Sequence, residues 1–168
     1  GNTVETDKSI YGKWQHTINK SLKYKVSLYA TGYSNNAAVY LQKNDSLYEE
    51  IKLEQLLLKP EVQVNIGSDP NSLWVLGTGY NYETVNSNRY GDLKVLQSSY
   101  IFAQKQTHFI NKINIIAGVR YDINKLYHSQ LSPKVAIAWK VNPAFILKGS
   151  VGAGFKAPDF RQQYLNFS

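Results

Sequence analysis

Short turn-forming segments alternate with longer polar segments along this chain, and stretches that suit β-strands fill the intervals. The turn formers gather at Asn19–Ser21, Gly67–Ser72, Phe109–Lys112 and Val141–Ala144. The longer polar segments cover Ser34–Ser46, Thr84–Leu93, Ile123–Gln130 and Lys156–Ser168. Antiparallel neighbours in a sheet can be joined by very short turns. The order therefore predicts an all-β, antiparallel up-and-down meander with tight connections at one end and long connections at the other.

The segments between the turns alternate apolar and polar residues with a period of two, as strands with two different faces do. In one of them the apolar face carries Leu22, Tyr24, Val26, Leu28 and Ala30. Similar alternation runs through Glu61–Ile66, Ser132–Lys140 and Ala144–Gly154, and it is less clean in Trp74–Glu83 and Ile113–Asp122. Tyr11–Ile18 and Val95–Gln106 are added as further strands. The sequence thus predicts about eight strands, each close to the length of about 9–11 residues that crosses a bilayer at a steep tilt.

The segment Leu47–Lys59 has two interpretations. Ser46-Leu47-Tyr48-Glu49 has the form of a helix capping box, good helix formers follow, and Pro60 would end the run. A strand here would instead supply the hairpin partner that the meander needs before the turn at Gly67. Because local propensity is a weak prior, we predict a strand for Leu47–Lys59 and keep the helix as the alternative.

Connections of unequal length at the two ends are typical of β-barrels that span a bacterial outer membrane. No stretch approaches the about 20 consecutive apolar residues of a membrane-spanning helix. Barrel strands alternate apolar and polar residues, so the low mean hydropathy of −0.38 fits such a barrel. The pattern therefore favours part of a membrane-embedded sheet.

Aromatic residues gather near the predicted strand ends, where an apolar ring with a polar tip suits a bilayer interface. Near the long connections lie Tyr33, Tyr40, Tyr80, Tyr82, Tyr90, Tyr100, Tyr121 and Tyr127. Near the short turns lie Trp74, Phe109, Trp139 and Phe145. This distribution predicts two aromatic belts, and ordinary cross-strand pairing in a soluble sheet is the alternative.

Several functional classes find no support in the sequence. The net charge of +7 comes from scattered lysines, which argues against nucleic-acid binding. The chain has 0 cysteines, and its histidines, His16, His108 and His128, are far apart, so no metal site is predicted. Nucleophile, phosphate-loop and dinucleotide motifs are missing, so we predict neither an enzyme nor a bound cofactor.

Three clusters in the second half resemble motifs of the TonB-dependent outer-membrane receptors. The first, Ala117-Gly118-Val119-Arg120-Tyr121-Asp122, is similar to a strand of that family that ends in G-x-R-Y-D. The second, Gln130-Leu131-Ser132-Pro133-Lys134, is similar to its L-S-P-[KR] strand start. The third, Gly152-Ala153-Gly154-Phe155-Lys156-Ala157-Pro158-Asp159-Phe160, is similar to its G-x-[GA]-[FY]-[RK]-A-P box. The residues that carry the resemblance are Arg120, Tyr121, Asp122, Leu131, Ser132, Pro133, Gly152, Gly154, Phe155, Lys156, Ala157 and Pro158. Lys156 stands where the family more often has arginine.

The resemblance implies a large barrel of about 22 strands with a plugged lumen. Residues 1–168 would then be a fragment of the barrel wall, without the plug domain and without the C-terminal strands. The implied function is TonB-dependent uptake of a scarce nutrient, namely a ferric siderophore, haem or a corrinoid. The implied partners are outer-membrane lipid, the nutrient itself, and TonB through the missing plug domain.

Two expectations concern side chains directly. Arg120 and Asp122 share a strand face at i and i+2, which allows an ion pair within one strand. Arg89, Tyr90 and His128 lie in predicted loops, where binding residues concentrate, and are our candidates for ligand contact.

A period of two does not reveal which face meets lipid. A soluble secreted barrel or sandwich that binds a small apolar ligand therefore stays open, as does an adhesive β-sheet protein.

Overall fold

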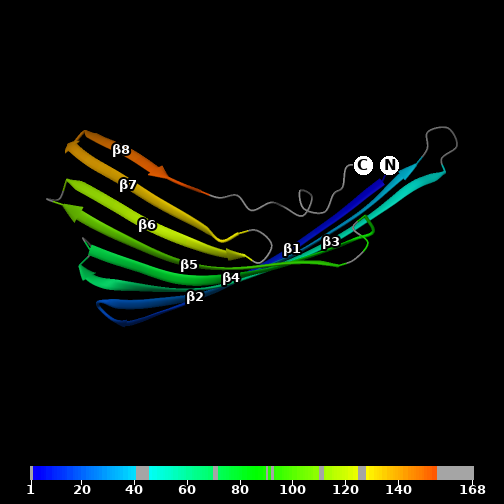
Figure 1. Cartoon of the computed structure of the whole chain (residues 1–168), viewed down its shortest axis with the longest axis horizontal. Coiled ribbons are helices and arrows are strands. Elements are labelled where there is room, and N and C mark those ends of the chain that lie inside the picture. The colour runs from blue at the N-terminus through cyan, green and yellow to red at the C-terminus, as the bar shows by residue number, and fades with distance from the viewer. Residues whose placement is uncertain are drawn as a thin grey trace.

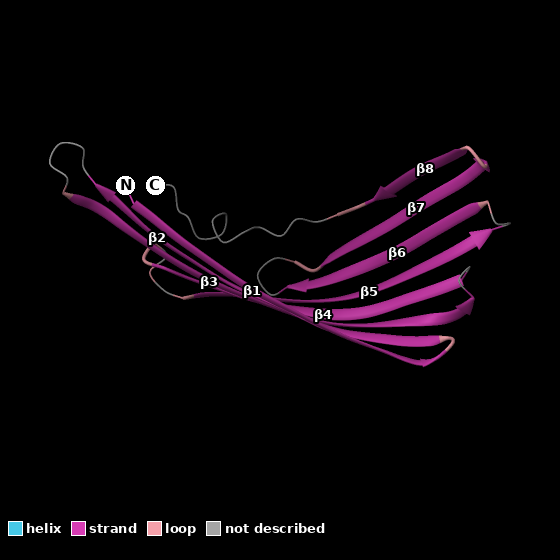
Figure 2. Ribbon diagram, turned by 180° about the vertical axis from the view of Figure 1, so that it is seen from behind, coloured by secondary structure: helices cyan, strands magenta, loops and turns pink. Residues whose placement is uncertain are grey.

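A computed structural model describes residues 2–40, 46–69, 72–89, 91, 93–109, 112–124 and 128–154. In these residues the backbone forms one 8-stranded sheet (Figures 1 and 2). The strands are β1 (Asn2–Asn19), β2 (Leu22–Tyr40), β3 (Leu47–Asp69), β4 (Ser72–Ser87), β5 (Lys94–Phe109), β6 (Ile113–Asn124), β7 (Gln130–Asn142) and β8 (Phe145–Gly152). Within this part of the chain, no helix is long and apolar enough to cross a bilayer.

The strands follow one another in sequence order, and every neighbouring pair is antiparallel. The predicted up-and-down meander is therefore confirmed, and Leu47–Lys59 is a strand inside β3 rather than a helix. The sheet twists and curves strongly, and its ends do not meet (Figure 1). In the described residues β1 pairs with β2 and β8 pairs with β7, and neither has a second neighbour.

The first strands are longer than predicted. β1, β2 and β3 contain 18, 19 and 23 residues, and they continue past the last β3–β4 pair, Leu53 with Ser87. The polar segment predicted as a loop from Ser34 is strand up to Tyr40. Polar residues extend the ladder because backbone hydrogen bonds hold it and side chains pair across it: Thr31 donates to Asp7 at 3.1 Å and Asn35 to Glu5 at 3.2 Å.

The register places apolar residues of all strands on one face, which we call the apolar face. One row across the sheet contains Trp14, Val26, Val62, Thr78, Ile101, Tyr121 and Leu131. The opposite face, the polar face, contains the row Lys13, Ser27, Glu61, Gly79, Tyr100, Asp122 and Gln130. In β6 the polar-face residues are the less exposed ones, as expected on the concave side of a curved sheet, where side chains converge.

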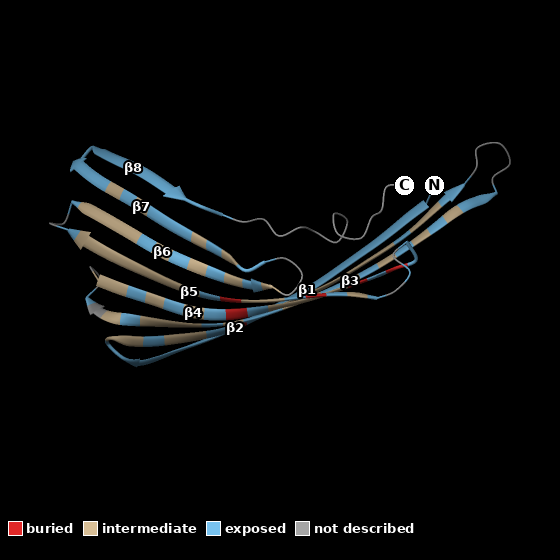
Figure 3. Ribbon diagram, in the orientation of Figure 1, coloured by how far each residue is buried: buried red, intermediate tan, exposed pale blue. Residues whose placement is uncertain are grey.

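The sheet has almost no core of its own (Figure 3). The buried hydrophobic residues in the described part are Val85, Leu96 and Tyr100, whereas Trp14 is 56% and Val151 74% exposed. No second layer of described residues covers the apolar face. This arrangement contradicts the alternative of a compact soluble barrel or sandwich, which needs its apolar surface closed inside.

The turn between β3 and β4 depends on Gly67, whose φ is 155° and whose N–H donates to the Ser21 carbonyl at 2.8 Å. A Cβ here would overlap the carbonyl oxygen of Ser72. We therefore expect Gly67→Ala to lower the free energy of unfolding of the full-length receptor by about 1–3 kcal/mol, measured by urea titration in lipid vesicles. Gly12→Ala is the control, because nothing lies within 4 Å of a Cβ there. Equal losses in both variants would contradict this assignment.

Candidate functional site

Tyr100 is the centre of a polar network on the polar face. Its hydroxyl donates to Glu61 Oε2 at 2.8 Å, and the other oxygen of this carboxylate lies 3.5 Å from Lys25 Nζ. The register explains the contact, because Tyr100 and Glu61 both pair with Gly79, which lies between them on β4. The tyrosine ring therefore has to cross β4 to reach its partner.

Arg120 completes this network from β6. Its guanidinium lies over the Tyr100 ring at 3.6 Å from the centroid, and Nη2 donates to Asp122 Oδ1 at 2.7 Å. The predicted pair between Arg120 and Asp122 is thus confirmed. Charged and aromatic side chains are linked from β2 to β6, and each has a partner. This centre is suited to holding the wall together rather than to receiving a ligand.

Glycines on β4 make the network sterically feasible. A Cβ on Gly79 would overlap the ring and hydroxyl of Tyr100, and a Cβ on Gly77 would overlap the Phe102 ring. The sequence analysis missed this role. The signal was present, because the paired Gly-x-Gly of β4 lies opposite the Tyr-x-Phe of β5 in the register.

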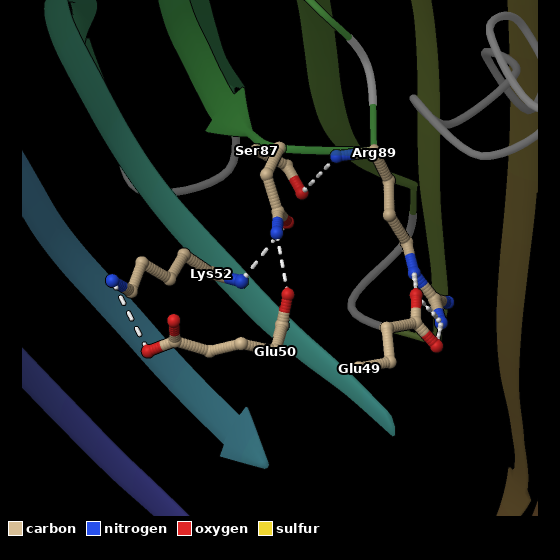
Figure 4. Close-up of polar contacts among 6 residues, drawn as sticks. Glu49, Glu50, Lys52, Ser87 and Arg89 are labelled. Carbon is tan, nitrogen blue, oxygen red and sulfur yellow. Dashed lines mark hydrogen bonds and ion pairs between the residues drawn. The ribbon is translucent and has the colours of Figure 1, made fainter. Parts of the chain in front are cut away.

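A second polar cluster lies where β4 ends, and we call it the rim clasp: Glu49, Glu50, Lys52, Ser87, Asn88 and Arg89 (Figure 4). Arg89 Nη2 donates to both carboxylate oxygens of Glu49, at 2.9 and 3.1 Å. The Asn88 side chain donates to the Glu50 carbonyl and accepts from the Lys52 N–H at 3.0 Å. Its amide therefore continues the hydrogen-bonding of the β3 edge beyond the last backbone pair with β4.

The opposite end of the polar face, near the short turns, contains a hollow of about 480 Å³. Asn114 and Ile116 of β6 line one side, and Lys148 and Ser150 of β8 line the other. Asn114 Oδ1 and Nδ1 of its neighbour His108 are buried without a hydrogen-bond partner among the described residues. Buried polar atoms normally have partners, so this end of the face is suited to a further polar surface.

The three sequence motifs come together on β6, β7 and the residues after β8. Arg120 pairs with Ser132, Tyr121 pairs with Leu131 on the apolar face, and the Ala153 N–H donates to the Pro133 carbonyl at 3.0 Å. Gly152 and Gly154 are both exposed; Gly152 pairs with Lys134, and a Cβ there would lie 3.0 Å from the Pro133 carbonyl oxygen, whereas nothing lies within 4 Å of a Cβ at Gly154. The other motif residues, Phe155, Lys156, Ala157 and Pro158, lie outside the described residues.

The residues predicted to contact a ligand lie on different connections of the sheet. Arg89 lies in the rim clasp, and exposed His128 follows β6, where its carbonyl accepts from Gln130 Nε2 at 3.4 Å. Tyr90 lies outside the described residues. Of the residues predicted for two aromatic belts, Tyr80 and Tyr121 lie exposed on the apolar face, as do Trp74, Phe109 and Trp139 at the short-turn end. The prediction was wrong for Tyr33, which pairs with Asp7 on the polar face, and for Tyr100, which is 7% exposed on that face because it fills the space above Gly79.

Comparison with known proteins decides the family. The model of the family described as "TonB dependent receptor-like, beta-barrel" matches residues 2–167. The chain belongs to this family. It is therefore part of an outer-membrane receptor and not an enzyme, as predicted.

Relatives and solved structures agree with this assignment. The iron-regulated outer membrane virulence protein of Vibrio cholerae is 27% identical over 127 residues, which cover 73% of this chain and 20% of that protein. The vitamin B12 transporter BtuB of the same species is 42% identical over 48 residues, covering 29% of this chain and 8% of that protein. This TonB-dependent receptor chain thus spans about a fifth or less of the curated relatives it matches.

The fold agrees with solved receptors. A variant of the ferric enterobactin receptor PfeA of Pseudomonas aeruginosa aligns with a TM-score of 0.69 at 13% identity, covering 94% of this chain and 27% of that one. The siderophore receptor PirA of Acinetobacter baumannii aligns with a TM-score of 0.68 at 16% identity, covering 93% of this chain and 26% of that one. The eight strands are therefore a continuous part of a receptor barrel.

Proposed function

We propose that this chain forms part of the barrel wall of a receptor that takes up a scarce nutrient across the outer membrane, with a ferric siderophore, haem or a corrinoid as cargo. One observation carries the proposal. The sheet has an exposed apolar face and, behind it, a face of charged and hydrogen-bonded side chains, on strands long enough to cross a bilayer. Relatives named for siderophore and vitamin B12 transport support the same class of cargo.

In this function the apolar face contacts lipid and the polar face lines the lumen. Lys105 supports this orientation, because it is a cation on the apolar face at the short-turn end. Its Nζ lies 4.9 Å from the Trp74 ring centroid and donates to Ser72 Oγ at 2.7 Å. A lysine beside a tryptophan, with its charged end directed to a polar group, suits the boundary between hydrocarbon and water.

The lumen then holds a plug domain that belongs to the same protein and lies outside this chain. The unpartnered atoms of His108 and Asn114 and the hollow beside Lys148 support this, since they offer polar contacts that the wall itself does not satisfy. TonB acts through the plug. The wall supplies the passage and its rim the first contacts with cargo, while no residue of this chain supplies energy.

Nitroxide labels in the full-length receptor test the orientation of the wall. A label at Val119→Cys, on the apolar face, is expected to be accessible to oxygen dissolved in lipid and shielded from a water-soluble nickel chelate. A label at Ser132→Cys, on the polar face, is expected to show the reverse preference. The same accessibility at both positions would contradict the proposal.

Growth tests identify the cargo. A deletion strain is expected to lose growth on one iron or corrinoid source and to regain it with the intact gene. Unchanged growth on ferric siderophores, haem and corrinoids alike would contradict the proposed uptake function. Because this outcome is independent of the labelling result, wall orientation and cargo class are tested separately.

A further inference from the structure

The ion pair of the rim clasp lies on the same face as the lumen wall. Glu49 shares its strand face with Leu53. Arg89 lies in the turn after β4, and its guanidinium reaches this face by its contact with Glu49. Leu53, Val85 and Leu96 form the small hydrophobic cluster next to it. Arg89 therefore lies on the polar face at the end of the sheet with the long connections. Figure 4 shows its guanidinium against the carboxylate of Glu49.

The contact between Glu49 and Arg89 has the geometry with which a guanidinium recognises any anion with paired oxygens. Arg89 uses Nε and Nη2, with donor–acceptor distances of 3.2, 2.9 and 3.1 Å to the carboxylate. The same fork accepts carboxylate, catecholate or phosphate oxygens. The donors that Glu49 occupies are therefore of a kind that also suits an external anion with paired oxygens.

Replacing Glu49 by another anion on Arg89 costs the fold little stability. The side chains of Arg89 and Glu49 are 48% and 39% exposed, and exposed ion pairs contribute little stability. The connection after β4 does not depend on this pair alone. Asn88 holds the β3 backbone at Glu50 and Lys52 independently of it, so Arg89 can change partner while the connection stays in place.

The charged side chains on the polar face below the rim clasp favour the binding of an anion. The polar face, from the short turns to the rim clasp, carries the cations Lys13, Lys23, Lys25, Lys59, Lys94, Arg120, Lys134, Lys140 and Lys148. Its acids over the same rows are fewer: Glu5, Asp7, Glu61, Asp69, Glu83 and Asp122. An anion released from Arg89 would therefore meet an excess of positive charge along the wall.

We propose that Arg89 is an anion-binding residue at the mouth of the barrel, that Glu49 occupies it in the cargo-free receptor, and that an anionic cargo binds by replacing Glu49. The inference rests on the proposed uptake function and specifies its cargo as anionic. Glu49 then acts as a built-in competitor that lowers the affinity for cargo and rejects anions too weak to displace it.

The experiment measures equilibrium binding of a ferric tris-catecholate, which is anionic, and of cyanocobalamin, which carries no net charge, to the full-length receptor. Glu49→Gln is expected to tighten binding of the ferric complex by up to about 5-fold, because an exposed competing pair is lost. Arg89→Gln is expected to weaken it by about 10-fold or more, and the double variant to match Arg89→Gln, because Glu49 acts only through Arg89.

Glu50→Gln is the matched control, since Glu50 is the neighbouring acid, pairs with Lys52 at 3.1 Å and belongs to the opposite face. It is expected to leave binding unchanged. Equal effects of Glu49→Gln and Glu50→Gln would overturn the inference in favour of general rim charge. A receptor that binds only cyanocobalamin would overturn it and keep the uptake function. A receptor that binds neither probe would overturn both for these cargo classes.

A measurement on the cargo-free receptor tests whether the rim clasp forms, independently of the proposed uptake function. In the cargo-free receptor, hydrogen exchange at the Lys52 amide is expected to be slow, because Asn88 accepts its N–H at 3.0 Å. It is expected to stay slow in Arg89→Gln and to accelerate in Asn88→Ala. Fast exchange at Lys52 in the unmodified receptor would show that the clasp does not form, and would overturn the inference without touching the proposed function.

Discussion

Ala103→Arg is expected to destabilise the full-length receptor in a bilayer by about 2–4 kcal/mol, the cost of a cation on the lipid face near the midplane. Ala103 lies on the apolar face of β5, between the row of Trp74 and Lys105 on its short-turn side and the row of Ile101 and Tyr121 on the other. Its own row contains Leu76, Val119 and Pro133, none of which carries a charge. The added guanidinium would therefore remain without a partner in hydrocarbon.

Gln104→Arg is the matched comparison. Gln104 is the next residue of β5, so it lies at the same depth but on the polar face, where it lies against Gly118. A long polar side chain faces the lumen there, so the expected loss is well below that of Ala103→Arg. Both are measured by urea unfolding in vesicles of one lipid composition. A larger loss for Gln104→Arg would reverse the assignment of the two faces.

The sequence predicted the wall well because a period of two is a direct consequence of strand geometry. Val62, Val64 and Ile66 belong to one face for any strand that contains them, and the structure keeps them there. The short turns also followed from local chemistry, since Gly67 alone provides the backbone geometry needed there. Family membership followed from motifs such as that ending at Arg120 and Asp122, now confirmed by the family match.

The lengths of β1 to β3 and the partners of Tyr100 could not be predicted in the same way. Whether Ser34–Tyr40 forms strand depends on a neighbouring ladder that only the register reveals, since its first five residues, Ser34–Ala38, are polar or small on both faces. Tyr100 was assigned to an aromatic belt because tyrosine suits an interface. Its real position follows from Gly79, a partner whose lack of a side chain makes it inconspicuous in a sequence. The rim clasp likewise joins residues 40 positions apart, Glu49 and Arg89.

Gly79→Val is expected to disrupt the Tyr100 network. A Cβ at this position would overlap the tyrosine ring and its hydroxyl, so the ring must leave the space above β4. Its hydrogen bond to Glu61 and the stacking of Arg120 are then lost together, while the Lys25–Glu61 and Arg120–Asp122 pairs keep only their ionic contacts. We expect the free energy of unfolding to fall by about 3 kcal/mol, since overpacking and the lost network add.

Two controls distinguish the steric overlap with Tyr100 from the effect of valine on strand propensity. Gly149→Val introduces the same side chain into β8, where nothing lies within 4 Å of a Cβ, and is expected to change stability little or to raise it slightly. Tyr100→Ala in the Gly79→Val background is expected to recover part of the loss, because removing the ring frees the space that valine needs. Purely additive losses in this double variant would mean that Gly79 serves β4 in some other way. Recovery would show that one glycine allows a tyrosine on β5 to reach a carboxylate two strands away, and so ties the lumen side of the wall together.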